Sequence, residues 1–368
     1  MRVFIRINSV CEFLTAVLVS WMSCQTISIN DYIGDILGMK LFVIGGAGYI
    51  GSHFIRYAIE KGHECVVYDN LSTGHKEALP KDVPLIEGNI LDEELLGASL
   101  KNEAPDVVLH YAALALVGES VQHPDLYYRN NVQGVTVLLD IIKKMNKKPA
   151  LVFSSSCAVF GDPEKLPVAE DDRKIPCSPY GRSKLVAEFI IEDYARAYGF
   201  RAMALRYFNA CGAHVDGDIG EDHEPETHLI PNVIKSVQTG QELTIFGDDF
   251  DTRDGSCLRD YIHVTDLASS HVQAAEELVK EGSPFEAIHL GTGNGLTNLE
   301  IVKTVGSVLD LDVKFTIGAR RSGDAAGLYA DNRKAKDLLG FKAEHSNIEN
   351  IIKTAVKWHE KNPNGYNS

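Results

Sequence analysis

The sequence predicts an α/β fold in which a doubly wound parallel sheet is followed by a smaller C-terminal α/β domain. From Lys40 onward, short apolar runs of strand length alternate with longer helical patterns. After about Asn209 the chain becomes rich in loops with clustered glycine, aspartate and histidine. Strands that alternate with helices require crossover connections, so the first half is expected to form a parallel sheet with helices on both faces.

Six apolar runs predict the strands of this sheet. Each is continuous rather than alternating, which is typical of strands that are buried on both faces. The runs are Lys40–Ile44, Cys65–Tyr68, Pro84–Glu87, Val107–His110, Leu151–Ser154 and Ala202–Leu205.

Helical patterns fill the intervals between these runs and continue into the second half. In the first half they cover about 49–61, 92–102, 125–145 and 179–198. In the second half they cover about 229–239, 264–281, 297–309 and 346–360. No linker rich in proline or serine separates the halves, so we expect them to pack closely.

The composition is that of a folded globular protein of about two domains. Of its 368 residues, 45% are hydrophobic and 24% are charged. A net charge of −15 argues against a nucleic-acid partner, because neutralising phosphates requires a basic surface. The 7 cysteines form no C-x-x-C pair, which disfavours a disulfide framework and a zinc ribbon and favours a reducing, cytoplasmic location.

Residues 1–38 are predicted to be an N-terminal extension, either a leader or the product of an over-called start. The apolar run Phe13–Met22 follows two arginines and resembles a signal peptide, although Glu12 adjoins it. The run is far shorter than the roughly 20 residues that span a bilayer, so no membrane partner is expected. Because Met39 opens the first strand, we expect the functional protein to begin there.

A glycine-rich turn joins the first strand to the first helix and predicts a dinucleotide site. Gly45, Gly48 and Gly51 follow the strand directly, and such a turn lets backbone N–H groups and a helix N-terminus approach a pyrophosphate. Asp69 ends the second strand, where a carboxylate accepts hydrogen bonds from the adenosine ribose. Since a carboxylate there repels the extra phosphate of NADP, the sequence predicts a Rossmann-type domain that binds NAD.

Candidate catalytic residues follow in the second part of this domain. Ser156 lies at the carboxyl end of a predicted strand, the edge at which open α/β sheets bind ligands. Tyr180 and Lys184 are four residues apart near the start of a helix and therefore share one face, with Ser178 expected as the N-cap. A phenol has a pKa of about 10, and we expect Lys184 and the helix dipole to favour its ionised form.

The G-x-x-G-x-x-G spacing and the Tyr-x-x-x-Lys pair resemble the short-chain dehydrogenase/reductase superfamily. From Met39 to the C-terminus, the chain is more specifically similar to the UDP-glucose 4-epimerase family, an extended branch of that superfamily. The resemblance is carried by the segments Gly45–His53, Tyr68–Leu71, Val117–Ser120, Phe153–Ser156, Ser178–Lys184, Arg206–Asn209, Ile245–Gly247, Arg259–His263 and Arg320–Asp324.

The resemblance implies an isomerase that interconverts UDP-galactose and UDP-glucose with NAD held permanently. Tyr180 would remove the proton of the sugar 4-hydroxyl while hydride passes from C4 to the nicotinamide. Ser156 would hydrogen-bond the same oxygen, and Lys184 would hold the nicotinamide ribose. The 4-keto sugar would then turn over and receive the hydride on its other face, so net redox change is zero.

The resemblance also implies the binding residues, the domains and the oligomeric state. Residues 39–208 would bind NAD, and residues 209–368, partly interleaved with them, would bind the UDP-sugar; a homodimer through a four-helix contact is implied. The cofactor set, besides the three glycines and Lys184, would be Tyr49, Ile50, Asp69, Asn70, Ser72, Thr73, Gly74, Asn89, Ile90, Asn130 and Phe208. The substrate set, besides Ser156 and Tyr180, would be Asn209, Leu229, Arg259, Arg321 and Asp324.

Several positions depart from the family pattern and leave the sugar specificity open. Asn89 replaces an aspartate, Ala115 a lysine and Ala158 a small hydroxyl residue. Leu328 has a volume between the tyrosine and the cysteine that distinguish pocket sizes, so N-acetylated sugars are neither expected nor excluded.

The segment from Glu221 to His228 contains three glutamates, one aspartate and two histidines. Its spacing is not that of an H-E-x-x-H site, and we expect a substrate loop rather than a metal site.

Three alternatives remain. One is an epimerase for another UDP-sugar, such as UDP-GlcNAc/GalNAc or UDP-xylose/arabinose. A dehydratase is disfavoured because Cys157 and Ala158, not an acidic pair, follow Ser156. An inert NAD-sensing protein is disfavoured because it has no need of an activated phenol.

Overall fold

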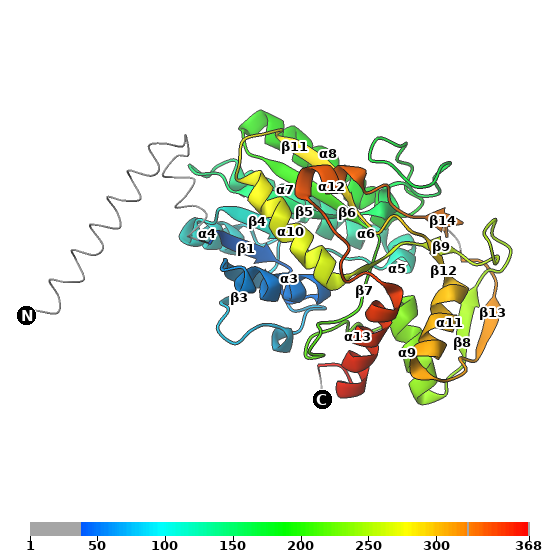
Figure 1. The fold of residues 1–368 in the computed structure, drawn as a ribbon. Helices are drawn as coiled ribbons and strands as arrows, with labels where there is room; N and C mark the ends of the chain where they lie inside the picture. Colours follow the sequence, from blue (N-terminus) through cyan, green and yellow to red (C-terminus); the bar gives the residue numbers. More distant parts are fainter. Residues whose placement is uncertain (1–37, 322–323, 367–368) are drawn as a thin grey trace, which may run out of the picture.

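The computed structural model describes residues 38–321 and 324–366, so the predicted extension and two residues of the Arg320–Asp324 motif lie outside the described residues. A seven-stranded parallel sheet crosses the molecule in the order β11-β6-β5-β4-β1-β2-β3 (Figure 1). The strands are β1 (Lys40–Ile44), β2 (Glu64–Asp69), β3 (Leu85–Glu87), β4 (Val107–His110), β5 (Ala150–Ser156), β6 (Ala202–Tyr207) and β11 (Phe285–Leu290). The order reverses direction between β1 and β4, the place where doubly wound sheets bind ligands.

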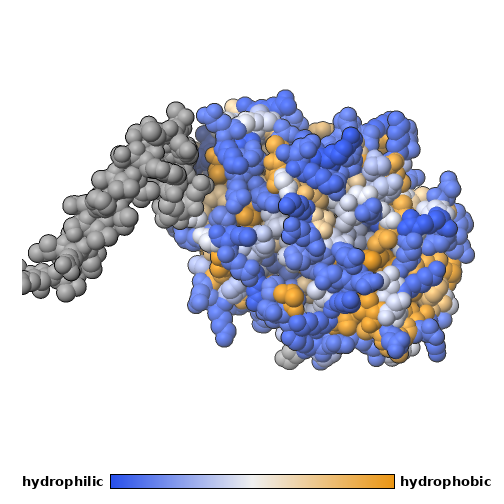
Figure 2. All heavy atoms as spheres, in the orientation of Figure 1, coloured by the Kyte–Doolittle hydropathy of each residue, from blue (hydrophilic) through white to orange (hydrophobic). Residues whose placement is uncertain are grey.

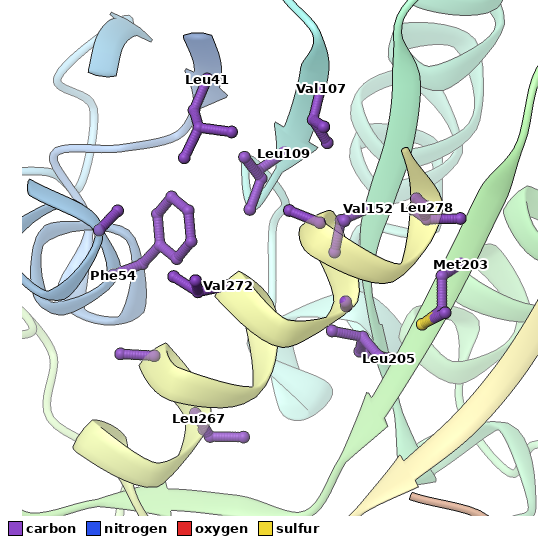
Figure 3. Close-up of a cluster of buried hydrophobic side chains, with 14 of the residues drawn as sticks. Leu41, Phe54, Val107, Leu109, Val152, Met203, Leu205, Leu267, Val272 and Leu278 are labelled. Atoms are coloured by element: carbon purple, nitrogen blue, oxygen red, sulfur yellow. The ribbon is translucent and has the colours of Figure 1, made fainter. Parts of the chain in front are cut away.

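Side chains of successive strand residues point to opposite faces of the sheet and build two separate hydrophobic layers. Leu41 and Val43 belong to one cluster, together with residues of α3 and α10. Phe42 and Ile44 belong to the other. Figure 3 shows the first layer, in which Phe54 and Val272 lie against the leucines and valines of the strands. Burial on both faces explains why the strands appear in the sequence as continuous apolar runs.

Helices cover both faces of the sheet. Helices α3 (Tyr49–Glu60), α10 (Val264–Leu278) and α12 (Arg333–Leu339) supply buried residues to the first layer, and α4 (Glu93–Glu103), α7 (Gly134–Ile142) and α8 (Pro179–Tyr198) to the second. As the sequence predicts, Ser178 is the N-cap of α8, because its hydroxyl accepts a hydrogen bond from the backbone N–H of Gly181 at 3.1 Å.

The second half forms a smaller lobe around a third hydrophobic cluster (Figure 1). Its helices are α9 (Leu229–Thr239), α11 (Asn298–Leu309) and α13 (Ile348–Lys361). Its strands form three small sheets: β7 (Asn209–Cys211) with β10 (Tyr261–His263), β8 (Leu243–Phe246) with β13 (Phe315–Gly318), and β9 (Leu258–Arg259) between β12 (Leu296–Thr297) and β14 (Gly327–Leu328).

The chain returns to the first domain after residue 208, so the two halves are interleaved. Strand β11 pairs with β6 at the end of the large sheet, and α10 and α12 pack on that sheet. The six predicted runs omit β11 because it begins with three half-buried residues, one of them Glu286. The return segments attach the smaller lobe to the sheet at several points.

The predicted helix over 125–145 is divided into three pieces. It consists of α6 (Pro124–Tyr127), a π-helical turn (Tyr128–Gln133) and α7, and a short helix α5 (Val117–Gln122) precedes it. The π turn contains Asn131, whose buried side chain bonds both backbone polar groups of Leu114, each at 2.9 Å. Periodicity alone does not reveal such a turn, because its one buried residue, Asn131, is polar and is held by bonds to a segment distant in the sequence.

The described residues also include two 3-10 turns, Lys76–Ala78 and Cys157–Val159.

Figure 2 shows a surface that is mostly hydrophilic, as the net charge of −15 suggests. Within residues 38–321 and 324–366, no helix combines the length and the apolar character needed to cross a membrane.

Candidate active site

A cavity of about 1150 Å³ opens at the carboxyl ends of the large sheet's strands and extends to the smaller lobe. All but one of the predicted site residues line it. They are Gly45, Gly48, Tyr49, Ile50, Gly51, Asp69, Asn70, Ser72, Thr73, Gly74, Ile90, Asn130, Ser156, Tyr180, Lys184, Phe208, Asn209, Leu229, Arg259, Arg321 and Asp324. Asn89 is absent from the lining: its side-chain carbonyl accepts the N–H of Leu91 at 2.9 Å instead.

The glycine-rich turn is packed so closely that it excludes side chains. Gly45 has a φ of +79°, and a Cβ there would lie 2.4 Å from the backbone nitrogen of Ala112. A Cβ on Gly51 would lie 2.5 Å from the carbonyl oxygen of Gly45. Gly48 is the N-cap of α3, and no side chain caps this helix. The first turn of α3 therefore faces the cavity with open backbone N–H groups, which suits an anion.

Asp69 holds this turn in place from the end of β2. One carboxylate oxygen accepts the backbone N–H of Ala47 at 2.9 Å and the other that of Leu71 at 2.8 Å. Burial raises the pKa of Asp69, and the hydrogen bonds from Leu71 and Ala47 act against that rise. The carboxylate thus links the end of β2 to the loop that follows β1.

Ser156, Tyr180 and Lys184 converge on the same wall of the cavity. Ser156 ends β5, and its hydroxyl accepts the backbone N–H of Ala158 at 3.1 Å. Lys184 is buried in α8 and donates from Nζ to the carbonyl oxygen of Ser154 at 2.7 Å, while Nζ lies 6.0 Å from the centre of the Tyr180 ring. Because α8 lies against β5, the helix presents the phenol beside the strand-end hydroxyl.

The electrostatics of the phenol differ from the sequence-based expectation. Burial raises the pKa of Tyr180 to about 12, with Ser156 acting in the opposite direction, and Lys184 is not among the causes. Burial also lowers the pKa of Lys184 to about 7, while Glu188 raises it. Desolvation thus dominates the pKa of Tyr180, and the expected lowering by Lys184 is not found.

Sequence reasoning missed a buried ion pair behind these residues. Glu188 lies one helical turn after Lys184 and pairs with Arg206 of β6 through two hydrogen bonds of 2.9 and 2.6 Å. Glu188 also accepts the hydroxyl of Ser155 at 2.5 Å. The pair joins α8 to β5 and β6 and so sets the distance between the phenol and Ser156. The four-residue spacing of Tyr180, Lys184 and Glu188 is the one pattern that could have revealed it.

Asn131 was also missed, although its neighbour Asn130 was predicted. Its amide donates to the hydroxyl of Ser183 on α8 at 3.0 Å, in addition to its two bonds with Leu114. Asn131 thereby ties the cavity loop after β4 to the helix that carries Tyr180 and Lys184. π-Helical turns of this kind recur at functional sites.

The opposite wall of the cavity carries the candidate substrate residues. Asp324 lies between two arginines: Nε of Arg321 is 3.1 Å away, and the guanidinium of Arg259 is 4.0 Å away. Arg321 is half exposed, with 55% of its side chain accessible. Asn209 donates to the carbonyl oxygen of Asp260 at 2.8 Å, and Leu229 begins α9. The two arginines make this wall locally basic although the whole chain is acidic.

Comparison with known proteins decides the family. Residues 41–291 match the NAD dependent epimerase/dehydratase family. The chain belongs to this family.

Relatives match over nearly their whole length. The UDP-glucose 4-epimerase of Lactobacillus helveticus is 46% identical over 329 residues, which are 89% of this chain and 99% of the relative. The crystal structure of UDP-glucose 4-epimerase from Brucella ovis in complex with NAD is 47% identical, with a TM-score of 0.83 over 87% of this chain and 98% of that chain. The enzyme from Bifidobacterium longum in complex with NAD+ and UDP is 38% identical, with a TM-score of 0.84 over 89% and 100%.

The residues of this NAD-dependent epimerase/dehydratase fit its cofactor. A Cβ at Gly51 would strike the carbonyl of Gly45, so glycine lets α3 begin close against the turn, where its uncapped start would meet the charge of a pyrophosphate. Asp69 lines the same cavity, where its carboxylate would accept from a ribose and disfavour the additional phosphate of NADP. Placement of the predicted residues around one cavity supports their assigned roles, which stay predictions.

Proposed function

We propose that this chain is a UDP-glucose 4-epimerase, which interconverts UDP-galactose and UDP-glucose through a 4-keto sugar. One observation carries the proposal. Ser156, Tyr180 and Lys184 line the same cavity as the glycine cradle on one side and Arg259, Arg321 and Asp324 on the other. A dinucleotide, a reactive phenol and an anionic sugar nucleotide can therefore meet in one space.

The glycine turn, Asp69 and Lys184 would hold NAD, which when bound supplies the acceptor and later the donor of the hydride at C4. Tyr180 acts as the general base that takes the 4-hydroxyl proton and then as the acid that returns it. Ser156 donates a hydrogen bond to the same oxygen and orients it. Because the proton and the hydride both return to the sugar, no second substrate is consumed.

The phenol requires assistance for this role. Burial raises its pKa to about 12, so Tyr180 is protonated at neutral pH unless a nearby charge favours the phenolate. A positive charge brought close to the ring by the ligands would lower that pKa by favouring the phenolate. Lys184 contributes by holding the ribose, and Glu188 supports the lysine charge from the next helical turn.

The two arginines would hold the diphosphate through charge-assisted hydrogen bonds. Asp324 keeps both guanidinium groups near the cavity wall before substrate arrives. A firmly held diphosphate and a loosely held sugar suit an epimerase, because the keto sugar must rotate to present its other face.

The proposal is tested by incubating the purified protein with UDP-galactose and resolving the products. We expect UDP-glucose to accumulate until both sugars are present at equilibrium, without added cofactor once the protein is loaded with NAD. Absence of UDP-glucose from a folded protein that contains NAD would contradict the proposal.

A second sugar specificity is left open by the pocket itself. Leu328 lines the cavity and is 7% exposed within a cluster that includes Phe160 and Phe208, and Ala158 offers no hydroxyl. The same assay with UDP-GalNAc and UDP-arabinose decides it. Faster conversion of either than of UDP-galactose would make the chain an epimerase for that sugar.

A homodimer would form through α5, α6 and α8. Four apolar side chains on these helices are exposed: Val117 (44%), Val121 (60%), Leu126 (44%) and Phe189 (55%). Burying them in a four-helix contact removes apolar surface from water. We expect the wild type to sediment with the mass of two chains and Phe189→Asp with the mass of one. A monomeric wild type would contradict this.

A further inference from the structure

Four side chains with metal-binding atoms converge in the loop between β7 and α9. One atom each from Glu221, His223, Glu226 and His228 lies within 4.8 Å of all the others. Nδ1 of His223 is 3.3 Å from Glu221 and 3.7 Å from Glu226. Nδ1 of His228 is 3.7 Å from Glu226 and also contacts Glu221. Both imidazole rings therefore direct the same nitrogen toward the two carboxylates.

These separations match the edges of a tetrahedral metal site. Bonds of about 2.0–2.2 Å from a zinc ion to histidine nitrogen and carboxylate oxygen place neighbouring ligand atoms about 3.3–3.6 Å apart. The contact of His223 with Glu221 is 3.3 Å, and each histidine is 3.7 Å from its nearer Glu226 oxygen, which is Oε2 for His223 and Oε1 for His228; all three distances lie within 0.1 Å of that range. The fourth, between Glu221 and His228, is shorter, and an ion would separate the two atoms as it enters between them.

The two carboxylates of the cluster are buried, and within the described residues the two imidazoles are their only side-chain partners. The side chains of Glu221 and Glu226 are only 4% and 11% exposed. In the parts of the chain that the structure describes, no lysine or arginine forms a salt bridge with either carboxylate. Glu188, which is similarly buried, has Arg206 as its partner. Buried carboxylates need a cation or hydrogen bonds to offset the loss of water.

Hydrogen bonds hold the backbone of this loop and one of the four ligands in position. Glu226 accepts the N–H groups of the two residues that follow it, each at 2.7 Å. Asn232 donates to the backbone carbonyl oxygen of His228 at 2.9 Å, and the indole of Trp358 donates to that of Glu221 at 3.0 Å. Supporting bonds are typical of metal sites, where they position ligands before the ion binds.

A second group of possible ligands in the same lobe provides a contrast. His214, Asp216 and Asp218 also lie close together, but both aspartates are exposed. Arg56 binds Asp218 through two hydrogen bonds of 2.6 and 2.5 Å and supplies the compensating charge. The Glu221 cluster has no such arginine.

We propose that Glu221, His223, Glu226 and His228 bind one divalent transition-metal cation of the zinc type. Two imidazoles with two carboxylates in a tetrahedral arrangement favour zinc over magnesium or calcium, which prefer six or more oxygen ligands. The site is structural, because all four positions are taken by the protein. The sequence spacing alone favoured a loop without metal, since it does not show that the four atoms converge.

The ion would stabilise the part of the cavity wall that lies between the cofactor and the sugar nucleotide. His223 packs edge-on against the ring of Tyr49 at the start of α3, with their centres 6.3 Å apart. His228 immediately precedes Leu229, where α9 begins. A cation would thus connect the cofactor turn with the helix at the sugar side. This inference does not depend on which sugar nucleotide the protein converts.

The first test measures metal on the full chain. The protein is stripped with a chelator, dialysed, and titrated with Zn2+ and, separately, with Co2+. We expect saturation at about one ion per chain and a Co2+ absorption spectrum of a four-coordinate site. The absence of saturable binding by either ion would overturn the proposal and leave the cluster as paired imidazoles and carboxylates.

Matched variants assign the ion to these residues. Glu221→Gln and His223→Gln are expected to abolish saturable binding, whereas Glu224→Gln, an exposed glutamate of the same loop, should bind like the wild type. Circular dichroism and NAD content show whether each variant is folded. If Glu221→Gln does not fold, His228→Gln, which changes the most exposed of the four ligands, takes its place. Unchanged binding in a folded ligand variant would overturn the assignment.

Discussion

The two halves of the cavity are built from different parts of the chain. On the cofactor side, the binding surface consists mainly of backbone groups. They are a glycine turn without room for a Cβ, the open start of α3, and strand ends held in a seven-stranded sheet. On the sugar side, long charged side chains project from short strands and loops, and Arg321 is half exposed. Backbone sites are rigid because the sheet fixes them, while side chains such as arginine keep rotational freedom. The difference suits a cofactor that stays and a sugar that must turn over.

Removing the phenol that lies between the two halves should have the largest effect. Tyr180→Phe is expected to lower the epimerisation rate about 10²- to 10⁴-fold, the usual contribution of a general acid–base. Because the ring and its packing remain, the NAD content of the purified protein should be unchanged. Product formation at fixed substrate measures the rate. Activity near that of the wild type would remove Tyr180 from the mechanism.

The buried ion pair on the cofactor side is expected to matter for stability. Glu188→Gln leaves Arg206 buried without a counter-charge, which should lower the free energy of unfolding by about 3 kcal/mol. Urea unfolding measures it. Glu349→Gln, whose side chain is 65% exposed beside Lys353, is the matched control and should cost less than about 0.5 kcal/mol. Equal losses in the two variants would show that burial of the pair is irrelevant.

A single methyl group tests the rigidity of the cofactor turn. Gly51→Ala places a Cβ 2.5 Å from the Gly45 carbonyl oxygen and is expected to lower stability by about 1–3 kcal/mol and to reduce NAD content. Gly97→Ala in α4, away from the cavity, is the control, because a Cβ there makes only an ordinary contact of 3.8 Å with the side chain of Ile141. If Gly51→Ala behaved like its control, the cradle would not be rigid.

The corresponding change on the sugar side should leave the cofactor in place. Arg321→Gln removes a charge from the diphosphate wall and should raise KM for the UDP-sugar about tenfold, equivalent to about 1.4 kcal/mol, with little change in kcat. NAD content and unfolding should match the wild type, because the side chain is 55% exposed. A loss of NAD in this variant would contradict the division between the two halves.

The smallest effect concerns a neutral histidine beneath the cofactor side. Burial lowers the pKa of His110 to about 3 from 6.5, so the unfolded chain binds more protons between these values and stability is lost as pH falls below 6.5. Among the residues that the structure describes, neither ring nitrogen of His110 has a hydrogen-bond partner.

Replacing this histidine should weaken the pH dependence. From pH 7 to pH 6, the wild type is expected to lose about 0.7 kcal/mol more than His110→Leu, as measured by urea unfolding. His123→Leu, at an exposed position, is the control and should retain the wild-type slope. The opposite ranking of the two slopes would show that His110 is already charged in the folded protein.

Much of the fold was predictable because its patterns are local. Each of the six apolar runs corresponds to one strand of the large sheet, with only Pro84 lying outside its strand β3, and the glycine turn follows the first. What was missed depends on distant partners. Strand β11 is recognisable only beside β6, and the π turn only through the bonds of Asn131 to Leu114. In the site, Ser156, Tyr180 and Lys184 follow from motifs, whereas the pairing of Arg206 with Glu188 behind them follows from none.

The sequence by itself determined the order of strands and helices in the first half, the family and the candidate catalytic residues. Each of these depends on spacings between residues that are close together in the sequence. Only the tertiary structure decided which groups meet. Ser155 and Glu188 are 33 positions apart and His228 and Glu221 are 7, yet each pair is in contact. The fold likewise decided the pKa shifts of Tyr180 and Lys184, because both side chains are buried beside the same cavity and lose the water around them. The spacing of residues in the sequence does not show which side chains meet or which are buried, because both depend on the packing of the whole chain.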